Sequence, residues 1–368
     1  MKKNPYIVQN FERMPGQLTI KQIAALSGVS VGTVDRVLHN RGKVSSEAMA
    51  AVQAVLETQS YKYNLHTSAV AFKKTRKSFK IVVAIPFSEK GEYWDLVRKG
   101  VEKAFVEYGD ISIKSKYVFF DQFNSLSCRD AFHVVASLNC SAVILGTTFV
   151  DETRELCAVL DSREIPYVFL DGKVAETHPV AAYLADQEAC GRLLARLMDG
   201  LTPSGKKLAL LLPRRIGTQM SNNSAVRVTS FKSFFSEGKL NREVVEGYFS
   251  IESPVKSHAD IRAFLAGNPG VGGVAVVIST GFLISDALSG GKGDLVVGGF
   301  DVTEGNARCV EEGTLDFLIN QHPEKQGFYS VESILHFLLY GAPDKTLREY
   351  LPIDIIFREN LSYWHDEV

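Results

Sequence analysis

The amino-acid sequence predicts a small all-α segment followed by an α/β core of two doubly wound parallel-sheet subdomains. The chain has 368 residues, which is enough for two or three domains. Residues 20–58 repeat apolar side chains at helical spacing. From residue 81 onward, short apolar runs alternate with helical patterns of about ten to fifteen residues, as they do in βαβ units.

Three short helices are predicted in the all-α segment. Thr19 is a good N-cap for the first helix, Gly28 breaks it, Ser30 caps the second, and the third spans Ser45–Thr58. Together they form a minimal bundle. The side chains predicted to face its core are Ile20, Ile23, Ala24, Leu26, Val34, Val37, Leu38, Met49, Val52, Val55 and Leu56.

The core begins after the basic, polar stretch 73–80, which we interpret as a linker. The predicted strands are Ile81–Phe87, Val118–Asp121, Ala142–Gly146, Tyr167–Asp171, Leu208–Pro213, Val274–Ile278 and Leu295–Asp301, with a further strand ending at Gln321. About 285 residues is too much for one sheet, so two subdomains are expected. Ligands bind such sheets beyond the carboxyl ends of the strands, so functional side chains are expected there.

The net charge of −1 conceals an asymmetry between the two parts of the chain. Residues 1–80 carry 13 basic and 4 acidic side chains, and the rest carries 28 basic and 38 acidic ones. A basic segment joined to an acidic body indicates a polyanionic partner for the first part, although basic ends are also common as plain solvated tails.

Cysteine usage and targeting signals favour the cytoplasm. The five cysteines form no C-x-x-C pair, which is typical of buried reduced thiols. The first ten residues have no apolar signal-peptide region, and no apolar run is long enough to span a membrane.

Residues 19–42 have the spacing of a helix-turn-helix. Ala24 is small where two helices must cross, and Gly28 supplies the turn. The second helix presents Arg36, which can donate two hydrogen bonds to a guanine in the major groove, while Ser30 and Thr33 could hold phosphates. Any small three-helix bundle shares part of this pattern.

The stretch 19–45 resembles the lactose-repressor (LacI/GalR) family of bacterial transcription regulators. It reads T-I-K-Q-I-A-A-L-S-G-V-S-V-G-T-V-D-R-V-L-H-N-R-G-K-V-S. The resemblance implies a headpiece over 19–63, a hinge or linker over 64–79 and an effector and dimerisation core over 80–368, after a leader over 1–18. It implies these DNA-binding residues: Thr19, Ser30, Val31, Gly32, Thr33, Asp35, Arg36, Asn40 and Val70.

Several of these residues depart from the family pattern. Val31 and Gly32 have no polar side chain, so base reading there would be apolar contact, for instance with a thymine methyl, or would be absent. Asp35 stands where the family usually has Ser, and it could accept from a cytosine or orient Arg36. Val70 falls at the Leu wedge position of the family's hinge helix and would unstack a base step less well. A plain linker is the alternative for this segment.

The core resembles ribose-type, type I periplasmic binding proteins, which implies a sugar site between two lobes. Three motifs support this resemblance: Ile85–Ser88 followed by Tyr93 and Trp94, Arg227–Phe231, and Gly298–Asp301. Carboxylates, amides and Arg suit sugar hydroxyls, and an aromatic ring suits the apolar sugar face. The effector-binding residues it implies are Phe87, Ser88, Trp94, Asp121, Asp171, Arg227, Thr280, Asp301 and Gln321.

Catalytic interpretations find little support. Residues 200–207 nearly form a phosphate-binding loop, but Lys207 replaces the required Ser or Thr and the helix precedes the strand. No H-E-x-x-H motif or metal-ligand spacing of histidines is present. We therefore expect no enzymatic activity, cofactor or metal. The expected protein is a cytoplasmic, allosteric, sugar-responsive regulator that reads a pseudopalindromic operator as a homodimer, and the resemblance implies a repressor. A transport-type sugar-binding protein or sensor is the alternative.

Overall fold

The computed structural model describes residues 20–38, 44–58, 78–109, 111–215, 221–238, 240–251, 253–288, 291–341 and 347–367. The chain divides into two compact units, 1–71 and 72–368. This division falls within the segment 64–79, for which the sequence predicts a hinge or linker. The predicted leader 1–18 and the predicted DNA contacts Thr19, Asn40 and Val70 lie outside the described residues.

The first unit contains the three helices that the sequence predicts: α1 (Ile20–Ser27), α2 (Val31–Leu38) and α3 (Ser46–Thr58). The Ser30 hydroxyl accepts a hydrogen bond from the Thr33 amide at 3.1 Å, which confirms Ser30 as the cap of α2. Ile23, Val34 and Val52 are completely buried. The prediction that Leu26 faces the core was wrong, since its side chain is 58% exposed; this small bundle buries one stripe of α1, which Ile23 and Ala24 occupy.

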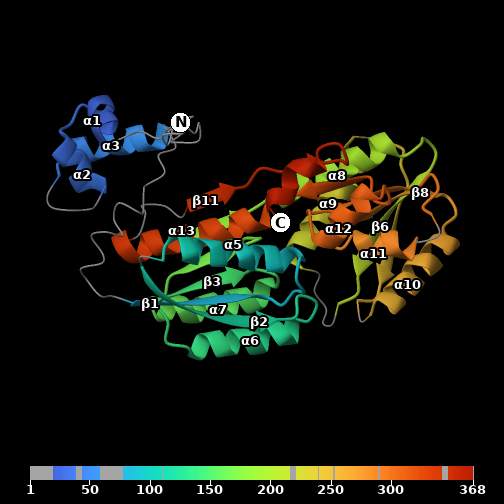
Figure 1. Ribbon diagram of the computed structural model, residues 1–368, viewed down its shortest axis with the longest axis horizontal. Helices are drawn as coiled ribbons and strands as arrows, with labels where there is room; N and C mark the ends of the chain where they lie inside the picture. Colours follow the sequence, from blue (N-terminus) through green and yellow to red (C-terminus); the bar gives the residue numbers. More distant parts are fainter. Residues whose placement is uncertain are drawn as a thin grey trace, which may run out of the picture. The chain divides into compact units, whose positions relative to one another are not determined.

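The second unit is built on two six-stranded sheets, which we call the sheets of lobe 1 and lobe 2 (Figure 1). Their strand orders are β11-β5-β4-β3-β1-β2 and β12-β10-β9-β8-β6-β7, and every recorded pairing is parallel except that of β10 with β12. Helices lie between most consecutive strands, though not between β4 and β5 or between β11 and β12, and they cover the sheets, as parallel sheets require. This confirms the predicted pair of doubly wound subdomains.

Lobe 1 contains β1 (Ser78–Pro86), α5 (Tyr93–Glu107), β2 (Ser112–Phe120), α6 (Ser125–Ser137), β3 (Ala142–Gly146), α7 (Val150–Ser162), β4 (Tyr167–Leu170), β5 (Ala181–Leu184), α13 (Pro323–Tyr340) and β11 (Leu347–Tyr350). Lobe 2 contains α8 (Gln187–Leu201), β6 (Lys207–Pro213), α9 (Asn222–Glu237), β7 (Val244–Phe249), α10 (Pro254–Gly267), β8 (Val271–Val276), α11 (Phe282–Ala287), β9 (Val296–Phe300), α12 (Glu304–Glu311), β10 (Phe317–Asn320), β12 (Asp354–Ile356) and the 3₁₀ helix η1 (Leu361–Glu367).

The chain passes between the lobes three times: after β5, after β10 and after β11. Each lobe is therefore assembled from separate parts of the sequence. The helix α13, from the end of the chain, packs against α5 and against β3, β4 and β5 of lobe 1.

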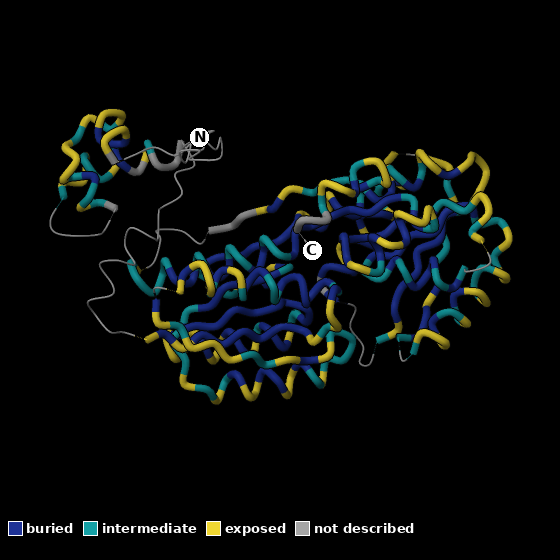
Figure 2. Tube along the Cα trace, viewed as in Figure 1, coloured by how far each residue is buried: buried dark blue, intermediate teal, exposed yellow. Residues whose placement is uncertain are grey.

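Except for β2, the strands that the sequence predicts are largely buried and lie inside the two sheets (Figure 2). The prediction located β3 correctly, because all five of its residues are buried and apolar. The strand β2 begins at Ser112 instead of Val118. It is an edge strand, and residues 112–117 are largely exposed or half-buried, so they lack a continuous apolar run.

The helices α5 and α13 approach each other unusually closely. A Cβ atom added at Gly100 would lie 1.9 Å from the backbone oxygen of Glu324, and one added at Gly327 would lie 2.1 Å from the backbone oxygen of Val97. Glycine at both positions therefore allows the two backbones to meet. Among the described residues, no helix is long and apolar enough to cross a membrane.

Candidate functional site

The predicted DNA contacts that the structure describes lie in α2 and at Ser30, the exposed residue that caps it. Val31, Gly32 and Arg36 are exposed, while Thr33 and Asp35 are half-buried. The Arg36 Nε donates to the Gly32 carbonyl at 3.1 Å, which holds the guanidinium along the surface of its own helix. This arrangement leaves one face of α2 exposed, and DNA contact through that face stays a prediction.

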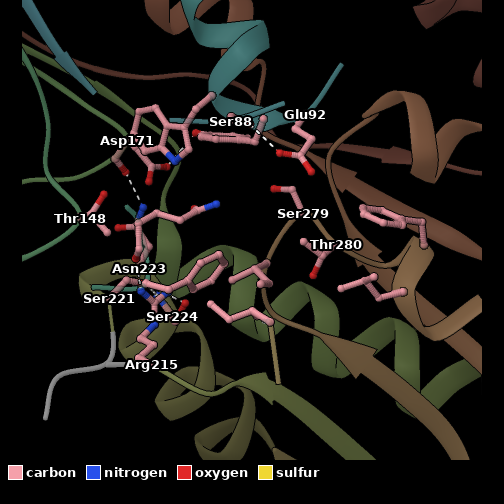
Figure 3. A pocket seen from close by; sticks show the side chains of 18 of the residues that line it. Ser88, Glu92, Thr148, Asp171, Arg215, Ser221, Asn223, Ser224, Ser279 and Thr280 are labelled. Carbon is pink, nitrogen blue, oxygen red and sulfur yellow. Dashed lines mark hydrogen bonds between the residues drawn. The ribbon is translucent and has the colours of Figure 1, made fainter. Parts of the chain in front are cut away.

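A pocket of about 320 Å³ lies between the two lobes of the core. Segments that follow β1, β2, β3 and β4 line it from lobe 1, and segments that follow β6, β7, β8 and β10 line it from lobe 2. It therefore lies at the carboxyl ends of both parallel sheets, where ligands bind in such folds. Figure 3 shows Ser88, Glu92, Thr148 and Asp171 of lobe 1 facing Arg215, Ser221, Asn223, Ser224, Ser279 and Thr280 of lobe 2.

On the side of lobe 1, Asp171 is the central polar residue. It follows β4 with a φ of +71°, and its Oδ1 accepts a hydrogen bond from the Tyr93 hydroxyl at 2.8 Å. Its backbone oxygen accepts from the Asn223 Nδ2 of lobe 2 at 2.8 Å, so the same residue also joins the lobes. Beside it, the Trp94 ring is 3% exposed and packs edge-on to Tyr93 at 5.2 Å, where it forms an aromatic wall of the pocket.

On the side of lobe 2, Arg227 organises a buried polar network. Its Nε donates to the Gln187 Oε1 at 2.7 Å and its Nη1 to the Val277 carbonyl at 2.7 Å, and its Nη2 donates to the Gln321 Oε1. The guanidinium also lies over the Phe300 ring, 4.1 Å from its centroid. These contacts fix the guanidinium plane and leave two of its five N–H groups for a bound molecule.

Asp301 lies behind this network. It is completely buried, and its carboxylate accepts from the Ser279 hydroxyl at 2.5 Å, from the Gln321 amide nitrogen at 3.0 Å and from the Gln321 Nε2 at 2.8 Å. It does not cap the following helix, because Thr303 is the N-cap of α12. Asp301 thus holds two residues that line the pocket, Ser279 and Gln321, without lining it itself.

Burial changes the acid–base properties of these groups. It raises the pKa of Asp301 to about 6, against the lowering effect of hydrogen bonds and of Arg227. It also raises the pKa of Asp171, and it raises the pKa of Tyr93 well above its usual value, with the nearby Asp171 adding to the effect.

Two threonine hydroxyls beside the pocket have no hydrogen-bond partner among the described residues. They are the Oγ1 atoms of Thr148, after β3, and of Thr280, after β8, and both residues line the pocket. A buried hydroxyl without a partner costs about 1–3 kcal/mol. A bound molecule that pairs with these hydroxyls after a side-chain rotation would recover part of that cost.

The structure brings most of the predicted effector residues together and separates three of them from the pocket. Ser88, Trp94, Asp171, Arg227, Thr280 and Gln321 line it. Phe87 is 58% exposed and packs on Phe119, and Asp121 is exposed and accepts from the Phe123 amide at 2.8 Å. Asp301 forms the layer behind the lining residues.

Sequence reasoning missed other lining residues, notably Thr148, Arg215, Asn223 and Ser224. Thr148 follows Thr147 directly after β3, so the strand-end rule could have included it. Asn223 and Ser224 lie in the first turn of α9, in the polar stretch that precedes Arg227. No group of three or more His, Cys, Asp or Glu side chains that could hold a metal ion occurs in the described part of the chain.

Comparisons with known proteins match both parts of the chain. The family described as "Bacterial regulatory proteins, lacI family" matches residues 19–64, and the family described as "Periplasmic binding protein domain" matches residues 81–341. The second match covers more than half of the chain.

The chain is also similar to two curated repressors and to a regulator of known structure. The chain is 26% identical to the ribose operon repressor of Lactococcus lactis over 66% of its length and 73% of the relative. It is 25% identical to the ribose operon repressor of Halalkalibacterium halodurans over 93% of its length and 96% of the relative. The crystal structure of a LacI-type transcriptional regulator from Bacteroides fragilis superposes on 78% of the chain and all of its own length, with a TM-score of 0.74 and 25% identity.

Proposed function

Because the chain belongs to the lacI family of bacterial regulatory proteins and carries a periplasmic binding protein domain, we propose that it is a repressor whose operator binding is controlled by a small sugar-like effector. The observation that carries the proposal is the polar pocket at the carboxyl ends of both sheets, in the same chain as the helix-turn-helix.

The effector that suits this pocket best is a neutral, monosaccharide-sized polyol. The cavity, about 320 Å³, is at the small end of the roughly 300–1,000 Å³ range of ligand pockets. Two acidic and two basic side chains line it, Glu92 and Asp171 against Arg215 and Arg227, so no single charge dominates. Trp94 offers a face for the apolar side of a sugar ring, and two relatives are named as ribose operon repressors.

DNA binding is assigned to the headpiece, residues 19–63, with the hinge 64–79 between it and the core, 80–368. The +9 charge of residues 1–80 supports this assignment, because phosphate contacts supply most of the affinity for DNA. We propose a homodimer, since a two-fold symmetric protein reads a pseudopalindromic operator. The effector would act allosterically, by changing how the two lobes close and thereby how two headpieces are spaced.

A cytoplasmic, non-enzymatic role follows from the same proposal. Two relatives are named as repressors, and Arg227 and Asp301 hold the buried side chains at the pocket through hydrogen bonds. The lacI-family region speaks against a transport-type binding protein, which needs no helix-turn-helix.

The test is a thermal-shift screen of the full chain against a panel of pentoses, hexoses, sugar acids and sugar phosphates. The best compound is then titrated calorimetrically and added to a complex of the protein with an operator selected from random DNA. A neutral sugar should bind and change operator affinity by about 5- to 150-fold. The proposal fails if no sugar binds, or if a sugar binds without any effect on operator affinity.

A further inference from the structure

Outside the pocket, the lobes meet where the start of α5 faces the start of α12. The Glu304 amide donates to the Gly91 carbonyl at 3.0 Å, and the Gly91 amide donates to the Asp95 Oδ2 at 2.9 Å. Gly91 belongs to lobe 1 and Glu304 to lobe 2, and neither residue lines the pocket. This contact therefore joins the lobes without touching a molecule held between them.

The contact requires glycine at position 91. Gly91 has a φ of +83°, and a Cβ atom there would lie 2.5 Å from the Glu304 Oε2 and 2.9 Å from the Glu304 Cβ. The carboxylate could swing aside, but the Glu304 Cβ is fixed to the backbone of α12. A side chain at position 91 would thus force the starts of the two helices apart.

A second contact joins the lobes beside the pocket. Arg215, which follows β6 in lobe 2, donates through its Nη1 to the Gln122 carbonyl in lobe 1 and lies 5.0 Å from the centroid of the Phe123 ring. Arg215 also lines the pocket, so its substitution would change closure and ligand contacts together. The Gly91–Glu304 contact offers a cleaner way to perturb closure alone.

We propose that the Gly91–Glu304 contact is a closure latch, which sets the spacing of the lobes and thereby positions the two halves of the pocket. Each half presents hydrogen-bonding groups to the same molecule, so a change in lobe spacing weakens binding without altering any lining residue. The part of the inference that concerns effector affinity rests on the proposed function; the part that concerns lobe spacing does not.

The experiment compares Gly91→Ala with Gly205→Ala in the full chain. Gly205 has a φ of +80° and no atom within 4 Å of an added Cβ, so both variants carry the same backbone strain and only Gly91→Ala creates a clash between lobes. Amide hydrogen exchange of the ligand-free proteins is measured at 147–150 of lobe 1 and 279–283 of lobe 2, two segments that line the pocket far from residue 91 in sequence.

Gly91→Ala should speed exchange in both segments by several-fold, and Gly205→Ala should leave both rates as they are in the parent protein. Adding Glu304→Gly to Gly91→Ala should restore slow exchange, because it removes the atoms that clash. Overpacking by a methyl group costs about 1–3 kcal/mol, so the sugar identified in the screen should bind Gly91→Ala about fivefold more weakly or worse.

Equal exchange rates in Gly91→Ala and Gly205→Ala, or no rescue by Glu304→Gly, would overturn the latch. If the exchange pattern appears but no sugar binds any variant, the latch stands and the proposed function fails. If sugar binds all variants with equal affinity despite the exchange pattern, the positioning role of the latch is refuted.

Discussion

Gly100→Ala tests the closest contact between two helices of the core. The added methyl carbon would lie 1.9 Å from the Glu324 backbone oxygen, 2.8 Å from the Glu324 carbonyl carbon and 3.0 Å from the Phe328 nitrogen. Ordinary van der Waals contact begins at 3.4 Å. Since all three opposing atoms belong to the backbone of α13, no side-chain rotation relieves the clash, and α5 and α13 must separate.

The expected cost follows from two opposing contributions. Overpacking costs about 1–3 kcal/mol and occasionally more, and a backbone clash belongs at the upper end of that range. Alanine favours the helical conformation over glycine by about 1 kcal/mol. The net loss is therefore about 2 kcal/mol or more, which lowers the melting temperature of a unit of about 300 residues by roughly 3 °C or more.

The assay is thermal unfolding of the full chain followed by circular dichroism, with Gly200→Ala as the control. Gly200 also lies in a helix, α8, but a Cβ there meets no atom within 4 Å. Gly200→Ala should therefore leave the melting temperature unchanged or raise it slightly. A Gly100→Ala protein as stable as the Gly200→Ala protein would refute the reasoning.

Three further predictions concern the pocket and the headpiece. Burial raises the pKa of Asp301 to about 6, so its protonated form contributes fully to stability below about pH 4, and this contribution is lost as the pH rises through 6. Between pH 4 and 7, the free energy of unfolding of the parent protein, measured in urea, should fall by up to about 3 kcal/mol relative to that of Asp301→Asn. A difference between the two proteins that does not change with pH would contradict this. Thr148→Val should raise the free energy of unfolding by about 1 kcal/mol because it removes an unpartnered hydroxyl. Thr153→Val should lower it by about 1 kcal/mol because the Thr153 hydroxyl donates to a backbone oxygen at 2.5 Å. Changes of the same sign in the two variants would count against the argument. Arg36→Ala should weaken binding to the selected operator by about 1–3 kcal/mol in fluorescence anisotropy and spare random DNA, while equal losses on both would mean that Arg36 contacts only phosphate.

The sequence predicts eight of the twelve described strands, because buried parallel strands are continuous apolar runs, such as β3 and β6. It misses β5, β7, β11 and β12. It also predicts that the polar residues after these strands lie together, since the carboxyl ends of parallel strands share one edge. It does not predict which of two neighbours faces the pocket. Phe87 and Ser88 both follow β1, but side chains alternate along an extended chain, and here Ser88 faces the pocket while Phe87 faces outward.

The sequence also does not predict which residues line a pocket and which support the lining residues from behind. Asp301 and Gln321 both follow strands, yet Gln321 lines the pocket and Asp301 supports it from behind. Arg215 and Asn223 belong to lobe 2 and contact lobe 1. The sequence alone does not predict how the two lobes pack against each other, so these residues were missed.

The three passages of the chain between the lobes have a consequence for synthesis on the ribosome. The strands β1 to β5 of lobe 1 emerge first, but the helix that packs against β3, β4 and β5 is α13, which ends at Tyr340. Roughly 150 residues separate β5 from the end of α13. At about 5–20 residues per second, the face of β3, β4 and β5 therefore stays uncovered for on the order of ten to thirty seconds, until α13 has been synthesised. During this interval lobe 2 emerges almost completely, lacking its edge strand β12 and the helix η1. Nascent chains that stall before residue 323 should therefore expose apolar sheet and require chaperones, although most of lobe 2 has already been made.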